Sequence, residues 1–230
     1  MFIIELITKI PWPAIAIGAG IIIVMATSFY FNTKNTILRV AKKLKNKPIS
    51  RVREGAYVKI IGNVRHVKDP LIAPLSGRKC VYYQIIVEQK GNKNWHTIIN
   101  DSSFQEFFIE AAGEMALINC HEFEKMTKVF LVKDHNESSG TFKDASFKLE
   151  QYLELHGKSS TGILGFNRQT RYKEGILALD EEIAVVGSAH WKSLAETVKG
   201  YRYSKILTLM GRPKKKLLIT DHPKALNHKS

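Results

Sequence analysis

The sequence is poor in cysteine, and this excludes several classes of protein. Two cysteines, Cys80 and Cys120, are too few for a disulfide framework and fit a reducing compartment. They also exclude a cysteine-rich zinc module. The eight histidines lack metalloprotease spacing, because the sequence has no His-Glu-x-x-His motif. It also has no Cys-x-x-Cys pair of the kind found in zinc fingers. The sequence therefore predicts no metal site, no cofactor and no catalytic residues.

Charge is missing from the stretch between Lys9 and Lys34. Within it, Trp12–Phe31 reads WPAIAIGAGIIIVMATSFYF, which as a helix spans roughly 30 Å, the thickness of the hydrocarbon core of a bilayer. Trp12, Tyr30 and Phe31 at its two ends are typical of a membrane interface. We expect a transmembrane helix. The alternative is a cleaved signal peptide, against which stand the length of the apolar run and the lack of a clear small-x-small site.

Acidic residues are missing from the next segment, 34–53, which carries eight basic residues. This flank is expected to stay on the cytosolic side, so the chain that follows is expected to be cytosolic. Apolar residues recur at helical spacing from Ile37 to Leu44. Two interpretations stay open, a basic amphipathic helix on the membrane surface and a solvated linker. The candidates for contact with anionic lipid are Lys34, Arg39, Lys42, Lys43, Lys45 and Lys47.

From Glu54 onward the pattern alternates with a period of two. Short strands between Gly, Pro and Asn turns, one internal helix and no βαβ rhythm predict a mainly β domain with a small OB-like barrel. The helix is expected over 146–157, with Phe147, Tyr152 and Leu155 on one face, and a polar loop is expected over 135–144. The expected strands are 54–67 with a bulge or bend at Gly62, 79–88, 95–100, a hairpin over 107–119 turning at Ala112 and Gly113, 128–134 and 216–220, and a strand-rich section is expected over 171–191.

The loop PLIAPLSG, residues 70–77, is the best candidate for a binding surface. Its prolines restrict the backbone, so contact with a partner would cost little ordering entropy. The guanidinium of Arg78 offers two parallel donors to a carboxylate or phosphate. The alternative is a rigid loop that plugs one end of the barrel. The predicted partner-binding residues are Pro70, Pro74, Ser76, Gly77, Arg78 and Lys79.

Two motifs that resemble catalytic sites have structural interpretations that we favour. Ser76 and Lys79 match Ser-x-x-Lys, but the lysine enters a strand, where positions three apart face opposite ways. Cys80 could join His66 and Asp69 in a thiol site, but its apolar strand predicts a buried structural thiol.

Two further motifs also have simpler interpretations. Cys120 and His121 are adjacent in the chain, so their side chains should diverge and a shared ligand role is not expected. Tyr82 and Tyr83, beside the basic end of the loop, could form an aromatic and basic face for single-stranded nucleic acid. GRPKKK, residues 211–216, adds a basic cluster of the kind that binds phosphate. We favour tyrosines in the core and a solvated turn, so nucleic acid is not the expected partner.

Four blocks of the sequence resemble successive parts of a known domain. They are GAYVKIIGNV, PLIAPLSGRKCVYYQIIVE, RYKEGILALDEEIAVVGSA and LLITDHPKAL. Together they look like the GIDE domain, also called BAM for "beside a membrane". That domain occurs in mitochondrial-anchored ubiquitin and SUMO ligases, in chloroplast outer-envelope ligases and in bacterial and archaeal membrane proteins. The resemblance covers roughly residues 54–226, and PLSGRKCVYY is its most specific piece.

The resemblance implies a β domain held close to a membrane. It implies no ligase activity for this chain, because neither the zinc ligands of a RING nor a second span follows the last block. We expect a non-enzymatic, single-pass protein of the bacterial inner membrane that binds a protein partner or lipid head groups. The alternatives are a part of ubiquitin-ligase machinery with its RING on another subunit, and an OB-like nucleic-acid-binding module. The expected divisions are 1–33 with the span, a basic linker or helix at 34–53, the β domain at 54–226 and a tail at 227–230.

Overall fold

The structure, a computed structural model, describes residues 12–120, 123–132, 135–138, 146–160, 168–193 and 205–226, with the backbone alone at 123–124 and 135–138. Its elements in chain order are α2 (Trp12–Phe31), α3 (Thr33–Lys43), the 3-10 helix η1 (Ile49–Arg51), β1 (Tyr57–His66), β2 (Leu71–Ile72), β3 (Lys79–Lys90), β4 (Trp95–Phe104), β5 (Phe107–Ala111), β6 (Glu114–Ile118), α4 (Phe123–Met126), β7 (Thr127–Phe130), β8 (His135–Ser138), α5 (Phe147–Leu155), β9 (Thr170–Ala178), β10 (Glu182–Ser193), β11 (Lys205–Met210), β12 (Leu217–Thr220) and α6 (Pro223–Leu226). The fold is mainly β, as predicted.

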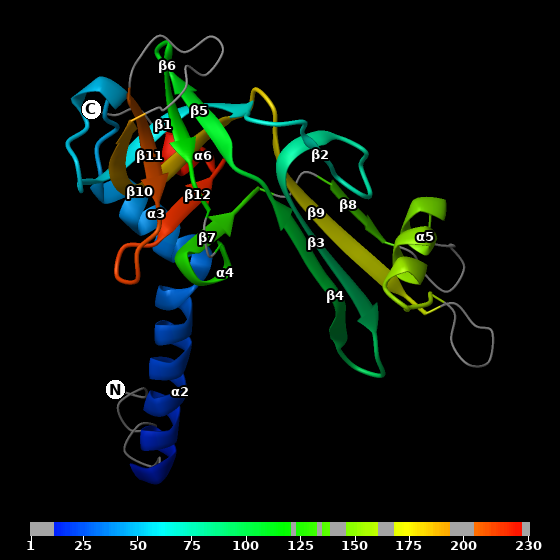
Figure 1. Ribbon diagram of the computed structural model, residues 1–230. Coiled ribbons are helices and arrows are strands. Elements are labelled where there is room, and N and C mark those ends of the chain that lie inside the picture. Colours follow the sequence, from blue (N-terminus) through cyan, green and yellow to red (C-terminus); the bar gives the residue numbers. More distant parts are fainter. Residues whose placement is uncertain are drawn as a thin grey trace.

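Five strands close into a barrel at one end of α2 (Figure 1). Going round, the order is β1, β5, β6, β11, β10 and back to β1. All neighbours are antiparallel except β6 and β11, which run parallel. Numbered along the chain, this is the order 1-2-3-5-4-1 of an OB-like barrel. The prediction of a small OB-like barrel is therefore confirmed, although the expected strands did not include β11.

Strand β1 is apolar on both faces because each face packs against something. Ile60 points into the barrel core, whereas Ile61 points outward and packs under α3. Ile37 and Ala41 of α3 cover it, and each is 1% exposed. Full burial of a side chain the size of Ile37 contributes about 1.5–3 kcal/mol. Helix α3 is thus part of the folded domain.

A second sheet lies beside the barrel and is built from the connections between barrel strands (Figure 1). The connection from β1 to β5 supplies β2, β3 and β4, and the connection from β6 to β10 supplies β8 and β9. Strand β3 is central, since it pairs with β4, with β9 and, at its start, with β2. Helix α5 packs on this sheet. The predicted hairpin of β3 and β4 is confirmed, and it lies outside the barrel.

The face predicted for helix α5 was wrong at two of its three positions. Leu149, Tyr152 and Leu153 are buried, whereas Phe147 is 75% and Leu155 is 83% exposed. The buried set follows the spacing i, i+3, i+4, which keeps side chains on one face of a helix. Phe147 and Tyr152 are five positions apart, or about 140° around the helix, so they cannot share that face.

Two further local predictions were wrong, one of them in part. Of the bulge or bend predicted at Gly62, the bulge is excluded, because the register of β1 against β10 runs through this residue without a shift. A Cβ atom there would lie 2.2 Å from the Glu110 carbonyl oxygen, so glycine allows the close approach of β5. Residues 135–138, predicted as loop, pair with β9 as strand β8. The rest of that predicted loop lies outside the described residues.

Candidate functional site

The described part of the chain contains one helix that is long and apolar enough to cross a membrane, α2. None of its residues is buried by the rest of the fold. Figure 1 shows it extending away from the barrel. A core helix of a globular domain would be covered by other elements, so α2 does not have that role.

The junction of α2 and α3, which we call the elbow (residues 29–39), is held by side-chain contacts. Asn32 interrupts the helix with extended backbone angles. Asn35 Nδ2 donates to the Phe29 carbonyl at 2.7 Å, and the Arg39 guanidinium donates to the Tyr30 carbonyl at 3.0 Å. The guanidinium also lies 3.7 Å from the centre of the Tyr30 ring. These contacts satisfy carbonyl groups at the end of α2 that would otherwise lack helical partners.

Helix α3 is amphipathic, as its spacing predicted, but its apolar face packs on the barrel. Ile37 and Ala41 contact Ile61, Ala184 and Leu218 in one hydrophobic cluster. The two interpretations left open by the sequence were a solvated linker and an amphipathic helix on the membrane surface. Helix α3 fits neither, because its apolar side is covered by the barrel. The elbow contacts and the packing of α3 together connect α2 to the barrel.

The six basic residues predicted to contact lipid lie in the elbow, in α3 and directly after α3. Lys34 Nζ lies 5.3 Å from the centre of the Phe130 ring, and Arg39 lies on Tyr30. These two are nearest to the end of the apolar helix. The other four, which are exposed, are Lys42, Lys43, Lys45 and Lys47.

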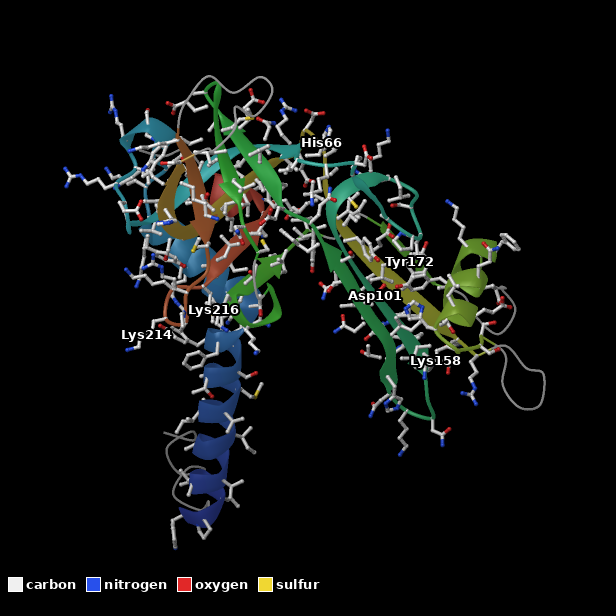
Figure 2. All side chains as sticks on the ribbon, viewed as in Figure 1. His66, Asp101, Lys158, Tyr172, Lys214 and Lys216 are labelled. Carbon is white, nitrogen blue, oxygen red and sulfur yellow. The ribbon has the colours of Figure 1, made fainter. Side chains whose placement is uncertain are left out.

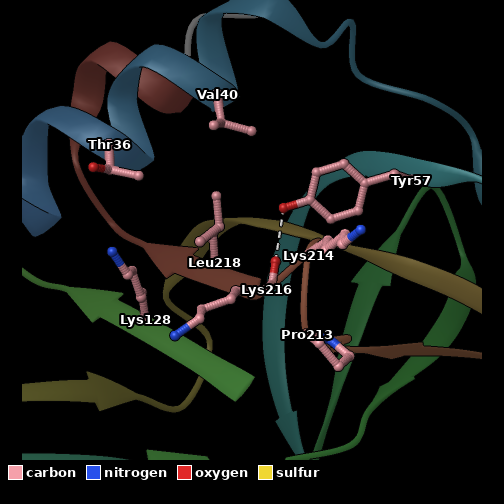
Figure 3. A pocket seen from close by; sticks show the side chains of 8 residues that line it. All are labelled: Thr36, Val40, Tyr57, Lys128, Pro213, Lys214, Lys216 and Leu218. Atoms are coloured by element: carbon pink, nitrogen blue, oxygen red, sulfur yellow. Dashed lines mark hydrogen bonds between the residues drawn. The ribbon is translucent and has the colours of Figure 1, made fainter. Parts of the chain in front are cut away.

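A pocket of about 240 Å³ opens between α3, β1, β7 and the turn before β12. We call it the basic pocket. Figure 3 shows its walls, with Thr36 and Val40 coming from α3 and three lysine side chains from β7 and the turn. No acidic residue is among the described residues that line it. The lining residues are Thr36, Val40, Tyr57, Lys128, Pro213, Lys214, Lys216 and Leu218.

Tyr57 positions the turn that carries two of these lysines. Its hydroxyl donates to the Lys216 carbonyl at 2.7 Å (Figure 3). Burial raises the pKa of Tyr57 to about 12, so the hydroxyl keeps its proton at neutral pH. The turn is also closed by backbone hydrogen bonds between Arg212 and Lys215 in both directions, at 2.9 and 3.0 Å. The basic groups therefore stand on an ordered scaffold.

The region beside the basic pocket is also positive. Burial, followed by the charges of Lys34 and Lys224, lowers the pKa of His222. The centres of the His222 and Phe130 rings are 5.9 Å apart. Lys34 of the elbow lies over the same Phe130 ring. His222 is therefore neutral at neutral pH, and the surrounding lysines carry the positive charge.

The predicted binding loop is rigid, but it packs on the second sheet and not on the barrel. Buried Glu174 of β9, 1% exposed, accepts the backbone N–H groups of Leu75 and Ser76, each at 3.0 Å. The Gly77 N–H donates to the Ala73 carbonyl at 2.9 Å and closes the turn. Pro70, Pro74 and Ser76 are half-buried, whereas Gly77, Arg78 and Lys79 are exposed at its tip.

Replacing Glu174 by alanine is expected to loosen this loop. The buried N–H group of Leu75 would lose its acceptor at about 1–3 kcal/mol, and the half-buried N–H of Ser76, which water can reach, would add less. The full-length protein in detergent should unfold about 2–12 °C earlier, and the amide protons of Leu75 and Ser76 should exchange faster with deuterium. Glu154→Ala, at an exposed position of α5, is the control and should change neither measurement. Unchanged amide exchange in Glu174→Ala would show that the carboxylate does not hold the loop.

The motifs that resemble catalytic sites do not assemble. Among the described residues no hydrogen bond joins Ser76 to Lys79, and Ser76 Oγ instead accepts from the Arg78 N–H at 3.5 Å. Cys80 is fully buried, and burial, with the charge of Glu174, raises the pKa of its thiol to about 11. His66 is exposed, and its Nδ1 lies 2.9 Å from the Lys68 carbonyl. Cys80 is thus the buried thiol that its strand predicted.

The other cysteine gives no site within the described chain either. Burial raises the pKa of Cys120, and its neighbour His121 lies outside the described residues. No group of three or more metal-ligating side chains occurs among the residues whose placement is described.

Within the described residues, the barrel face formed by β5 and β6 lacks the features of a nucleic-acid platform. Tyr82 is 3% exposed and belongs to the barrel core, so it cannot stack on a base. Strands β5 and β6 form the face that OB barrels use for oligonucleotides, and neither strand contains Lys or Arg. That face carries Glu110, which pairs with Arg65 at 2.6 Å, and Glu114, which accepts the Ser50 N–H.

Sequence reasoning found part of the basic pocket and missed the rest. The cluster 211–216 was singled out as basic, but Lys128 and Tyr57 carry no motif. Strand β7 pairs in parallel with β12, with Leu218 opposite Lys128, and this pairing brings the lysines together. Only a prediction that β7 pairs with β12 would have placed Lys128 beside Lys214 and Lys216.

Comparisons with known proteins add no identity. The chain matches no family model, no curated protein and no solved structure. The resemblance to the GIDE domain therefore stays a prediction from four sequence blocks, and the function must be argued from the apolar helix, the elbow and the OB-like barrel.

Proposed function

We propose that this chain is a single-pass membrane protein whose β domain is held at the cytosolic face as a module that binds a protein partner or lipid head groups. The observation that carries the proposal is α2, an apolar helix of spanning length with no buried residue. Such a surface is stable in lipid and costly in water. The expected GIDE-like character of residues 54–226 agrees with a position beside a membrane.

The elbow supports an anchor over a cleaved signal sequence. The Arg39 guanidinium donates to the Tyr30 carbonyl and lies on the Tyr30 ring, and Thr36 Oγ1 donates to the Phe31 carbonyl at 3.4 Å. Cleavage near Phe31 would remove these partners from a helix that is packed into the domain. A signal peptide that is cleaved off needs no such contacts with the part of the protein that remains.

The charge distribution supports a cytosolic domain. Eight basic residues follow α2 between 34 and 53, with no acidic residue among them, and positively charged flanks stay on the cytosolic side. The elbow and α3 would then hold the barrel close to the bilayer. The second sheet offers the preorganised loop 70–79, whose exposed tip carries Arg78 and Lys79. Contact with a protein partner there would cost little ordering entropy.

Labelling of a surface cysteine tests the orientation. In a Cys120→Ala background, Lys158→Cys places a thiol at an exposed site just after helix α5, while Cys80 stays buried. A membrane-impermeant maleimide should leave this variant unlabelled in intact cells and label it after the cells are opened. The background variant without the new cysteine is the control. Labelling of intact cells would place the domain outside and contradict the proposal.

A further inference from the structure

The basic pocket lies at the level where lipid head groups would be, if α2 spans the bilayer. The apolar helix ends at Phe31, and Thr36 in the pocket wall follows five residues later. Asn32 is extended and residues 33–36 are helical, so the chain rises at most about 9 Å between Phe31 and Thr36. The head-group layer on each side of the hydrocarbon core is of a similar thickness, about 5–7 Å. Figure 2 shows Lys214 and Lys216 beside the end of α2 that meets the barrel.

The chemistry of the pocket fits a phosphate attached to an apolar body. Lys128, Lys214 and Lys216 supply ammonium groups, which bind phosphate as point charges. Among the described residues none of the three forms an ion pair with a carboxylate, and no acid lines the pocket. Val40 and Leu218 provide an apolar wall for the carbon atoms next to the phosphate. The neighbouring Lys34 adds positive charge beside the pocket, and its charge, after burial, lowers the pKa of His222.

We propose that the basic pocket binds the phosphate of an anionic phospholipid in the leaflet where α2 ends. This inference rests on the proposed function, because it needs α2 to span the membrane. Lipid is the favoured source of the phosphate for two reasons. Each lysine close to an anionic leaflet increases the affinity for that leaflet about fivefold. The head groups around an anchored protein are also at high local concentration. The barrel would then be attached at two points, by the elbow and by a lipid.

Native mass spectrometry of the full-length protein in detergent tests this. Phosphatidylglycerol should bind at least tenfold more tightly than phosphatidylcholine. The main complex should contain one phosphatidylglycerol molecule per protein. The variant K128Q/K214Q/K216Q should lose roughly a hundredfold in affinity for phosphatidylglycerol, from about fivefold per lysine. The charge-retaining variant K128R/K214R/K216R should bind within about threefold of the original chain.

The matched control is K68Q/K158Q/K192Q, which removes the same charge from exposed positions that do not line the pocket. It should keep the preference for phosphatidylglycerol. Figure 2 shows Lys158 on the side of the second sheet, far from Lys214 along the molecule. If the control loses as much affinity as the pocket variant, the attraction is diffuse and the inference is wrong. It is also wrong if the pocket variant keeps its affinity, or if millimolar inorganic phosphate or glycerol phosphate displaces the lipid.

Alkaline carbonate extraction of the same proteins separates the two proposals. The pocket variant should remain in the membrane, because α2 is unchanged. If the original chain is extracted, the proposed function itself fails. If the original chain resists extraction but shows no preference for phosphatidylglycerol, only the inference about the pocket fails.

Discussion

An Ile21→Arg, Ile22→Arg variant is expected to leave the membrane almost completely. Both residues lie at the centre of α2, where each arginine raises the free energy of insertion by about 2.5–3.5 kcal/mol. Two of them shift the insertion equilibrium by about 6 kcal/mol, or roughly four orders of magnitude. After cell-free synthesis with liposomes, the original chain should stay in the pellet on carbonate extraction and the variant should move to the supernatant.

The fold of the β domain should survive this change, because Ile21 is 56% and Ile22 is 67% exposed and no part of α2 is buried. The variant in the supernatant should therefore show the same cooperative unfolding as the original chain in detergent. Ile21→Leu, Ile22→Leu keeps the apolar surface and is the control, and it should remain in the pellet. A variant with two arginines that still resists carbonate would show that α2 is not what holds the protein to the lipid.

Gly62→Ala is expected to cause the largest loss of stability of any single change considered. The added Cβ would lie 2.2 Å from the Glu110 carbonyl oxygen and 2.8 Å from its carbon, far inside contact distance. Both are backbone atoms, so no side chain can move to make room. Strand β5 would have to separate from β1 where the barrel closes, at a cost of about 3 kcal/mol or more. The unfolding temperature of the full-length protein in detergent should fall by about 6–12 °C.

A second strand glycine gives a matched control. At Gly175 of β9 an added Cβ would meet Leu131 at 3.5 Å, an ordinary van der Waals distance. Gly175→Ala should therefore change the unfolding temperature by only a few degrees, although the substitution is chemically the same. Equal effects at Gly62 and Gly175 would show that the approach of β5 to β1 is not the source of the constraint.

The local properties of the sequence predicted most of the secondary structure. Alternation between Val58, Ile60 and Val64 on one side and Lys59 and Arg65 on the other predicted β1 correctly. A run of β-branched and aromatic residues closed by a turn predicted the β3–β4 hairpin. Both patterns depend only on neighbours in the chain. The turn at Ala112 and Gly113 was also correct, and both residues have positive φ angles, 51° and 79°. Strand β11, KILTLM, was missed because a short apolar run without alternation cannot be assigned from periodicity.

Errors arose where the environment of a residue, and not its type, decided its role. Phe147 and Leu155 are apolar, yet Leu149 and Leu153 form the buried face of α5 because the second sheet lies on that side. Tyr82 and Tyr83 are adjacent, but only Tyr82 reaches the barrel core. The binding loop was predicted as rigid from its prolines, while the carboxylate that holds it comes from Glu174, about a hundred residues later.

The sequence by itself determined the apolar helix of spanning length, the basic flank after it and the β class of the domain. These follow from composition and short-range periodicity, which need no knowledge of distant contacts. Only the tertiary structure decided that α3 turns its apolar face to the barrel, that two insertions form one sheet, and that Lys128 shares a pocket with Lys214 and Lys216. The reason is physical: the partner of each surface is supplied by strands that are remote in sequence, and their pairing is chosen by the packing of the whole core.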